Sequence, residues 1–163
     1  MNRFYSIVIA LAIVGVSLSF VTFGPATENS LRIGEKVTNK KCVPNAEKYA
    51  FVNFWAAYDA ESREENVRFS EVIKRFEACS NNKGESIKSV SVSMDTYESI
   101  FEEIVKKDGL SFSDIYREAD GFDSQMAKDF KLGNQFGNFL IDAQGQLVAK
   151  NITPDEFERM LNK

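Results

Sequence analysis

Residues 51–69 read FVNFWAAYDAESREENVRF and contain the first strong strand pattern of the sequence. The stretch begins with an apolar run that is typical of a strand buried on both faces, and it continues after a short turn as a helical pattern. Free backbone N–H groups and the helix dipole converge where such a strand ends at the start of a helix. This elbow therefore has the geometry of a site for an anion or a nucleophile. Its side chains are Asp59, Ala60, Glu61 and Ser62.

Composition narrows the chemistry that the chain can perform. The 163 residues suffice for one domain and an extra segment, and the net charge of −4 argues against a nucleic-acid partner. The chain has no histidine, which excludes histidine zinc sites and the Ser-His and Cys-His nucleophile pairs. Its two cysteines are too few for a zinc site of four thiolates. We therefore expect neither a metal nor a cofactor.

The first 26 residues predict export. Arg3 is their only charge, and residues 4–23 form an uncharged run that is roughly long enough to cross a bilayer. Gly24 and Ala26 place small residues where a signal peptide would be cut. Residues 1–26 are thus either a cleaved signal peptide or an N-terminal membrane anchor. In both cases the rest of the chain would be periplasmic or otherwise extracytoplasmic.

The remaining chain alternates strands and helices, which is the order of an α/β fold. We assign residues 27–41 to a linker and lead-in, and residues 42–163 to one domain. The expected strands are residues 49–55, 87–94, a short one within 110–124, 136–141 and 146–151. The expected helices are residues 60–79, one that opens at Asp95 or Thr96 and closes at Gly109, a short one around 126–130, and a last one after Thr153.

The elbow resembles that of the thioredoxin-like, membrane-anchored oxidoreductases of the cell envelope and of related thiol peroxidases. Their strand reads like FWA-x-W and is followed by C-x-x-C-R. Phe54, Trp55 and Ala56 match that strand. Tyr58 stands for the second aromatic residue, and Arg63 matches the basic residue after the motif.

The likeness extends through ADGFDSQMAKDFKL and FLIDAQGQLVAKN to the last helix, so it covers about residues 31–163. It implies a thioredoxin-like fold, a three-layer α/β/α sandwich with a mixed central sheet. It also implies a place among the proteins of the cell envelope.

Two departures from the family alter its active surface. Asp59 and Ser62 stand where the family has its two cysteines, and a carboxylate and a hydroxyl neither attack nor resolve a disulfide. Gln135, Phe136 and Gly137 stand where the family has a cis-proline. A cis bond without proline costs roughly 2.5 to 4 kcal/mol, so we expect a trans loop.

We accordingly expect no catalytic residue at the elbow and interpret Asp59 as the N-cap of the helix. An alternative is that Asp59 and Glu61 form a general acid/base pair or a weak cation site. Residues two apart at a helix start do not face each other, which argues against that alternative.

Cys42 and Cys79 are the other candidates for chemistry. The strand and helix between them place both near one pole of the domain, so we predict a structural disulfide. It would close a loop of about 37 residues and contribute roughly 2 to 4 kcal/mol. The alternatives are two free thiols that pack as small apolar groups, or a relocated redox pair.

These features favour a non-catalytic protein-binding or scaffold module of the cell envelope, which presents Trp55, Tyr58 and Phe136 to an unknown envelope protein. Core packing is the alternative for Trp55 and Phe136. The competing function is a thiol-disulfide oxidoreductase or peroxide reductant that works through Cys42 and Cys79. The resemblance would also suit a protein that assists envelope-protein folding or cytochrome maturation.

Overall fold

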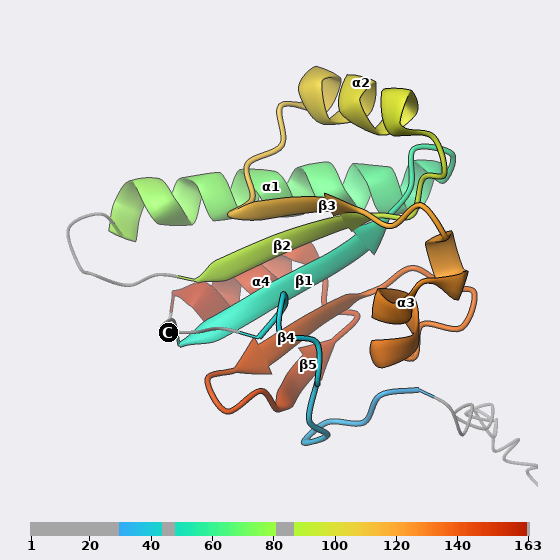
Figure 1. Ribbon diagram of the computed structural model, residues 1–163. Helices are drawn as coiled ribbons and strands as arrows, with labels where there is room; N and C mark the ends of the chain where they lie inside the picture. The colour runs from blue at the N-terminus through green and yellow to red at the C-terminus, as the bar shows by residue number, and fades with distance from the viewer. Residues whose placement is uncertain (1–29, 44–47, 81–86, 163) are drawn as a thin grey trace, which may run out of the picture.

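The computed structural model describes residues 30–43, 48–80 and 87–162, and Figure 1 shows their arrangement. The predicted signal peptide or membrane anchor at residues 1–26 lies outside these residues. Within the described part of the chain, no helix combines the length and the apolar character that crossing a membrane requires.

A five-stranded mixed sheet forms the middle layer, with its strands in the order β3-β2-β1-β4-β5. The strands are β1 (Tyr49–Trp55), β2 (Lys88–Ser93), β3 (Asp114–Arg117), β4 (Asn138–Asp142) and β5 (Leu147–Lys150). Strand β2 is parallel to both β1 and β3, whereas β4 is antiparallel to both β1 and β5. Since β1 lies in the centre, both of its edges are hydrogen-bonded and both of its faces are covered, which explains its apolar sequence.

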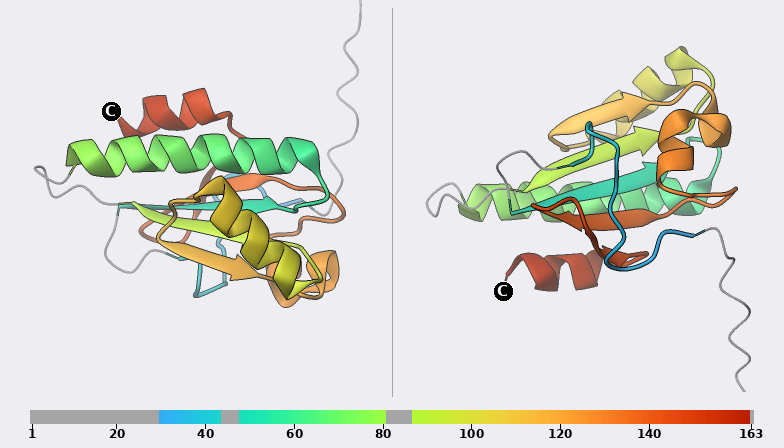
Figure 2. Two further views of the ribbon diagram at one scale, coloured as in Figure 1. Left: turned by 90° about the horizontal axis from the view of Figure 1, so that it is seen from above. Right: turned by 60° about the horizontal axis from the view of Figure 1, so that its bottom comes forward.

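Helices cover both faces of this sheet. Helices α1 (Ala60–Ser80) and α4 (Pro154–Leu161) lie on one face, and α3 (Gln125–Asp129) with the 3-10 turn η1 (Gly121–Asp123) lies on the other, as Figure 2 shows. Helix α2 (Glu98–Asp108) lies beyond the edge strand β3, and none of its residues is buried. The expected three-layer α/β/α sandwich with a mixed central sheet is confirmed.

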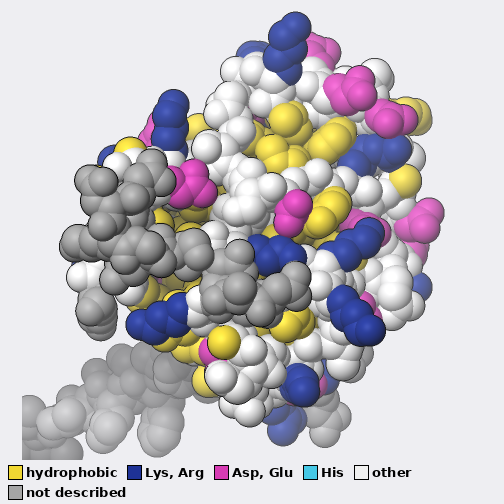
Figure 3. All heavy atoms as spheres, turned by 60° about the vertical axis from the view of Figure 1, so that its left-hand side comes forward, with side chains coloured by type: hydrophobic (Ala, Val, Ile, Leu, Met, Phe, Trp, Pro, Cys, Tyr) yellow, Lys and Arg dark blue, Asp and Glu magenta, His cyan; other side chains and the backbone are white. Residues whose placement is uncertain are grey.

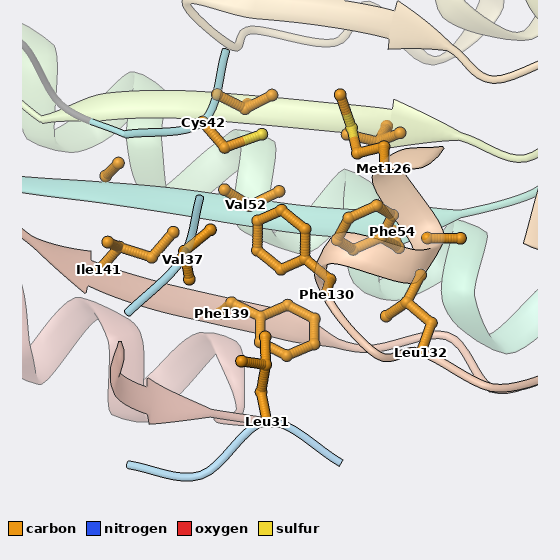
Figure 4. Close-up of a cluster of buried hydrophobic side chains, with 14 of the residues drawn as sticks. Leu31, Val37, Cys42, Val52, Phe54, Met126, Phe130, Leu132, Phe139 and Ile141 are labelled. Atoms are coloured by element: carbon orange, nitrogen blue, oxygen red, sulfur yellow. The ribbon is translucent and has the colours of Figure 1, made fainter. Parts of the chain in front are cut away.

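Aromatic side chains fill the apolar core on each face of the sheet. On the side of α1 and α4, the ring centroid of Phe51 lies 4.7 Å from that of Phe69 and 4.2 Å from that of Phe157. On the side of α3, the ring centroid of Phe54 lies 5.0 Å from that of Phe130. Figure 4 shows these two rings among the other side chains of that core. Phe51 and Phe54 point to opposite faces because successive side chains alternate along a strand.

Residues 30–43, which contain the described part of the lead-in, pack against the hairpin of β4 and β5. Leu31 and Val37 are buried in the core on the α3 side (Figure 4). The Leu147 N–H donates to the carbonyl of Glu35 at 2.9 Å, so the lead-in also pairs with the outer edge of β5. This segment is therefore part of the packed domain in the structure.

Local helix signals predict two of the helix ends correctly. Thr153 caps α4, and its side chain and that of Glu156 form the complete capping box. Helix α2 ends at Gly109, whose φ of 58° is left-handed and so favours glycine at this position.

The expected start of α2 at Asp95 or Thr96 is wrong. The helix begins at Glu98, and Tyr97 occupies the N-cap position without a capping hydrogen bond from its side chain. The carboxylate of Asp95 is engaged elsewhere, because it accepts the N–H of Ala57 at 3.0 Å. A tertiary contact thus takes the group that would otherwise cap the helix.

Acidic and basic side chains are mixed on the face of the molecule that Figure 3 shows. Lys and Arg side chains there lie beside Asp and Glu side chains, with apolar side chains between them. Such a mixture produces no extended field of one sign over that face.

Replacing Phe157 tests the aromatic core between α4 and the sheet. Phe157 is fully buried, so we expect Phe157→Ala to lower the free energy of unfolding by about 3 to 5 kcal/mol. Urea denaturation followed by circular dichroism measures this loss. Ile33→Ala is the control, because Ile33 is exposed and should change stability little. A loss below about 1 kcal/mol for Phe157→Ala would contradict the packing described.

Candidate functional site

Asp59 caps α1 at the elbow, as predicted. The Ser62 N–H donates to Asp59 Oδ1 at 2.8 Å, and the Arg63 N–H donates to the Asp59 carbonyl at 3.1 Å. The carboxylate thus satisfies a free N–H of the first helical turn and lies at the positive end of the helix dipole. This structural role explains why a carboxylate is stable at this position.

Ser62 is buried and joins the end of β1 to the start of α1. Its Oγ accepts the N–H of Ala56 at 3.3 Å and donates to the carbonyl of Asp59 at 3.3 Å. Both hydrogen bonds stay within the elbow, so the hydroxyl is already partnered as donor and as acceptor. The side chains of Ala60 and Glu61 between them are exposed.

Trp55 lies in the core and not on the elbow surface. It is fully buried, and its indole N–H donates to Ser91 Oγ at 2.8 Å. The Ser91 hydroxyl in turn donates to Asn66 Oδ1 at 3.0 Å, and the amide of Asn53 donates to the same oxygen at 2.9 Å. The predicted exposure of Trp55 in a recognition surface is therefore wrong, and the alternative of core packing is correct.

Asp95 lies directly under the elbow and was not predicted as a site residue. Its side chain is buried, and both carboxylate oxygens lie 3.0 Å from the N–H of Ala57. The Ser93 hydroxyl donates to Asp95 Oδ2 at 2.6 Å. No lysine or arginine nitrogen among the described residues forms a salt bridge with it. The signal that could have revealed this contact is the serine alternation in β2, because serines in a doubly covered strand need partners.

Arg63 pairs with the end of α2. Its guanidinium donates two hydrogen bonds to Asp108, at 2.7 Å from Nε and 2.6 Å from Nη2. Hydrogen bonding to Asp108 raises the pKa of Arg63. This bidentate pair fixes α2 beside the start of α1.

The loop of Gln135, Phe136 and Gly137 is trans throughout, as expected from the absence of proline. The Gly137 carbonyl accepts the N–H of Phe54 at 3.0 Å, which holds the loop against β1. A Cβ atom at Gly137 would lie 2.6 Å from Asn151 Oδ1, so a larger residue there would displace the Asn151 side chain. Gln135 is exposed beside it.

Three aromatic side chains gather at the elbow, and we call Tyr58, Phe122 and Phe136 the elbow aromatic patch. The ring of Phe136 lies 6.1 Å from that of Tyr58 and 5.1 Å from that of Phe122. Tyr58 is 69% exposed, whereas both phenylalanines are half-buried. Partial burial, with the carboxylates of Asp95 and Asp59, raises the pKa of the Tyr58 hydroxyl.

The predicted disulfide between Cys42 and Cys79 is absent, since both thiols are free. Cys42 is buried in the core on the α3 side of the sheet, where Figure 4 shows it near Val52. Cys79 is exposed near the end of α1 and lies beside Arg75 and Phe76, on the other side of the sheet. The order of strand and helix places both cysteines near one pole of the domain, but it does not determine on which face of the sheet each cysteine lies.

Cys42 is held as a thiol rather than a thiolate. Burial raises the pKa of Cys42 to about 12, so its thiol stays protonated at neutral pH. A dithiol reaction requires a thiolate and a second sulfur within bonding distance, and the sheet separates this pair.

The described residues offer no obvious metal site. No three Asp, Glu or Cys side chains in this part of the chain lie close enough together to hold an ion. Asp59 is engaged as the cap of α1, and Glu61 points into solvent. The geometry thus gives no support to an acid/base pair formed by these two residues.

Replacing Asp59 tests its capping role. We expect Asp59→Ala to lower the free energy of unfolding by about 1 kcal/mol, because the Ser62 N–H loses its acceptor. Asp59→Ser keeps a capping oxygen and should retain most of that stability. Urea denaturation of the two variants and the wild type provides the comparison. Equal stability of Asp59→Ala and the wild type would show that the cap contributes nothing.

Comparison with known proteins places this geometry in a family. No protein-family model matches the chain, and no curated protein sequence matches it. Among solved structures, a thioredoxin-like protein from Parabacteroides distasonis is 34% identical to this chain with a TM-score of 0.71, over 82% of this chain and 97% of that chain.

More distant solved structures share the fold. A thiol-disulfide oxidoreductase from Bacteroides fragilis is 21% identical with a TM-score of 0.61, over 80% of this chain and 98% of that chain. The thioredoxin domain of a thiol-disulfide oxidoreductase from Bacteroides vulgatus is 18% identical with a TM-score of 0.62, over 82% and 97%. On the strength of the first similarity and of the architecture described above, this chain belongs to the thioredoxin-like family.

Proposed function

We propose that this chain is a non-catalytic thioredoxin-like domain that binds another protein through the elbow surface. The observation that carries the proposal is the chemistry of the elbow. Asp59 caps α1 and Ser62 bonds the backbone on both sides of the turn, so no sulfur occupies the positions where thiol-disulfide exchange needs one.

The cysteines elsewhere in the chain are poor substitutes. Cys42 is buried as a protonated thiol, and Cys79 is exposed on the opposite side of the sheet. Neither lies in the elbow, where the helix start would stabilise a thiolate. A catalytic cycle that forms and breaks a bond between these two sulfurs would require the fold to open.

The elbow aromatic patch suits protein recognition. Tyr58 exposes most of its ring, and Phe136 supports that ring from the neighbouring loop. Aromatic side chains bury much apolar area at low cost in side-chain entropy and dominate many protein interfaces. The exposed amide of Gln135 provides a polar neighbour at the rim of the patch.

The domain acts, in this proposal, on the outer side of a membrane. Arg3 followed by the uncharged residues 4–23 would keep the N-terminus in the cytoplasm and direct the rest of the chain outward. Residues 1–26 would serve either as the anchor or as a cleaved leader. The partner would accordingly be another protein of the cell envelope.

The competing function is a thiol-disulfide oxidoreductase or peroxide reductant. Two observations favour it: similar solved structures bear the name thiol-disulfide oxidoreductase, and Cys79 is exposed. It would require Cys42 or Cys79 to react with substrate.

Redox assays of the full chain separate the two functions. We expect no reduction of insulin and no consumption of hydroperoxide beyond the rate with dithiothreitol alone. The double variant Asp59→Cys/Ser62→Cys restores a dithiol at the helix start and should increase insulin reduction at least about tenfold over wild type. Asp59→Cys alone is the matched control, because it lacks the resolving thiol. Wild-type turnover that disappears in Cys42→Ala or Cys79→Ala would overturn the proposal.

A crosslinking experiment tests the binding role. Membranes from cells that express the tagged full chain are treated with a short crosslinker, and the captured proteins are identified by mass spectrometry. Tyr58→Ala and Phe136→Ala should each reduce capture of a specific partner about fivefold or more, because Tyr58 is the exposed ring of the patch and Phe136 supports it. Ile33→Ala, at an exposed site on the lead-in, should leave capture unchanged. Undiminished capture by both patch variants would exclude this surface.

A further inference from the structure

A second surface lies beside the elbow, and we call it the α2 groove. It is an open groove of about 410 Å³ between the elbow and the N-terminal half of α2. Its lining includes Ala57, Tyr58, Asp95, Tyr97, Ile100 and Ile104. It shares only Tyr58 with the elbow aromatic patch.

The outer wall of the α2 groove is the apolar side of a helix that contributes nothing to the core. None of the residues of α2 is buried, although Ile100 and Ile104 lie one turn apart on a single face. Tyr97 is 68% exposed and Ile100 is 43% exposed. An amphipathic helix at the sheet edge with its apolar side open indicates a surface that another chain covers.

The inner wall of the α2 groove carries an unbalanced negative charge. Asp95 is only 4% exposed, and no salt bridge with it occurs among the described residues. Arg117 donates to the carbonyl of Thr96 at the groove at 2.9 Å and forms a salt bridge with Glu98 at 3.7 Å. Arg63 is paired with Asp108. The backbone N–H of Ala57 and the hydroxyl of Ser93 donate to the Asp95 carboxylate, but no counter-ion for its charge lies among the described residues.

The effect of this charge reaches the groove surface. Partial burial is the largest cause of the raised pKa of the Tyr58 hydroxyl, and the carboxylates of Asp95 and Asp59 raise it further. Tyr58 and Tyr97 also present exposed rings, and the face of an aromatic ring attracts a cation. The groove therefore combines an apolar outer wall, formed by α2, with an inner wall at Asp95 that favours positive charge.

We infer that the α2 groove binds a segment of a partner protein in which lysine or arginine adjoins apolar residues. The apolar side chains of the partner segment lie against Ile100 and Ile104. Its cationic group approaches the inner wall at Asp95, between the rings of Tyr58 and Tyr97. Charge complementarity selects this partner over an acidic one. The inference goes beyond the function proposed above, because it depends neither on Phe136 nor on whether the elbow is redox-active.

A peptide titration of the ¹⁵N-labelled full chain, followed by its amide NMR spectrum, tests the inference. The probe is acetyl-Leu-Lys-Leu-amide, and acetyl-Leu-Glu-Leu-amide and acetyl-Gly-Lys-Gly-amide are the matched controls. The lysine-leucine peptide should shift the amide signals of Ala57, Thr96 and Ile100 and bind at least about fivefold more tightly than either control. Equal binding of the glutamate peptide would overturn the inference.

Variants of the two walls locate the peptide. Ile100→Ser and Asp95→Asn should each weaken binding about fivefold, and the amide spectrum reports whether each variant is folded. Ile33→Ser and Asp155→Asn alter exposed residues elsewhere and should bind like the wild type.

Phe136→Ala separates this surface from the elbow aromatic patch. It should leave peptide binding unchanged while it disrupts the patch. Binding that Phe136→Ala abolishes and Ile100→Ser preserves would place the peptide on the patch and overturn the inference.

Discussion

The double burial of β1 is the constraint on which the rest of the structure depends. Both edges of the strand are hydrogen-bonded to neighbouring strands, and aromatic cores cover both of its faces. Each polar group on it must therefore find a partner inside the protein. The indole N–H of Trp55 does so through Ser91, and the amide of Asn53 does so through Asn66. The strand then leaves the sheet at a single tight elbow, which fixes where α1 begins.

The elbow has the geometry of a site for a nucleophile, but the side chains of Asp59 and Ser62 there stabilise the fold. A nucleophile needs an atom whose lone pair is free to attack, whereas the side-chain oxygens of Asp59 and Ser62 are already engaged. The carboxylate of Asp59 holds the helix start, the hydroxyl of Ser62 bridges the turn, and Asp95 holds the backbone of Ala57 from below. Arg63 reaches away to Asp108. These hydrogen bonds keep the elbow in shape, so the oxygen atoms of Asp59 and Ser62 have structural roles.

The sequence predicts those features whose causes are local. The capping box at Thr153, the glycine at 109 and the order of strands and helices depend on neighbouring residues, and the structure agrees with them. The start of α2 was missed because Asp95 bonds to a residue distant in sequence. The disulfide was wrongly predicted because the side of the sheet on which Cys42 and Cys79 lie depends on how the lead-in crosses the sheet, which no local pattern records. The negative charge of the α2 groove comes from Asp95 after β2, and its apolar wall comes from α2. The groove is therefore recognised only when both elements are placed in space.

The lead-in has a consequence for how the protein should be produced. An uncovered strand edge recruits strands from other molecules, and the lead-in covers the outer edge of β5 through the bond between Leu147 and Glu35. A polypeptide shortened to start at residue 42 would lose this cover together with Leu31 and Val37. Aggregation of such a fragment would then report its exposed sheet edge rather than any property of the native protein. Expression should start upstream of residue 30.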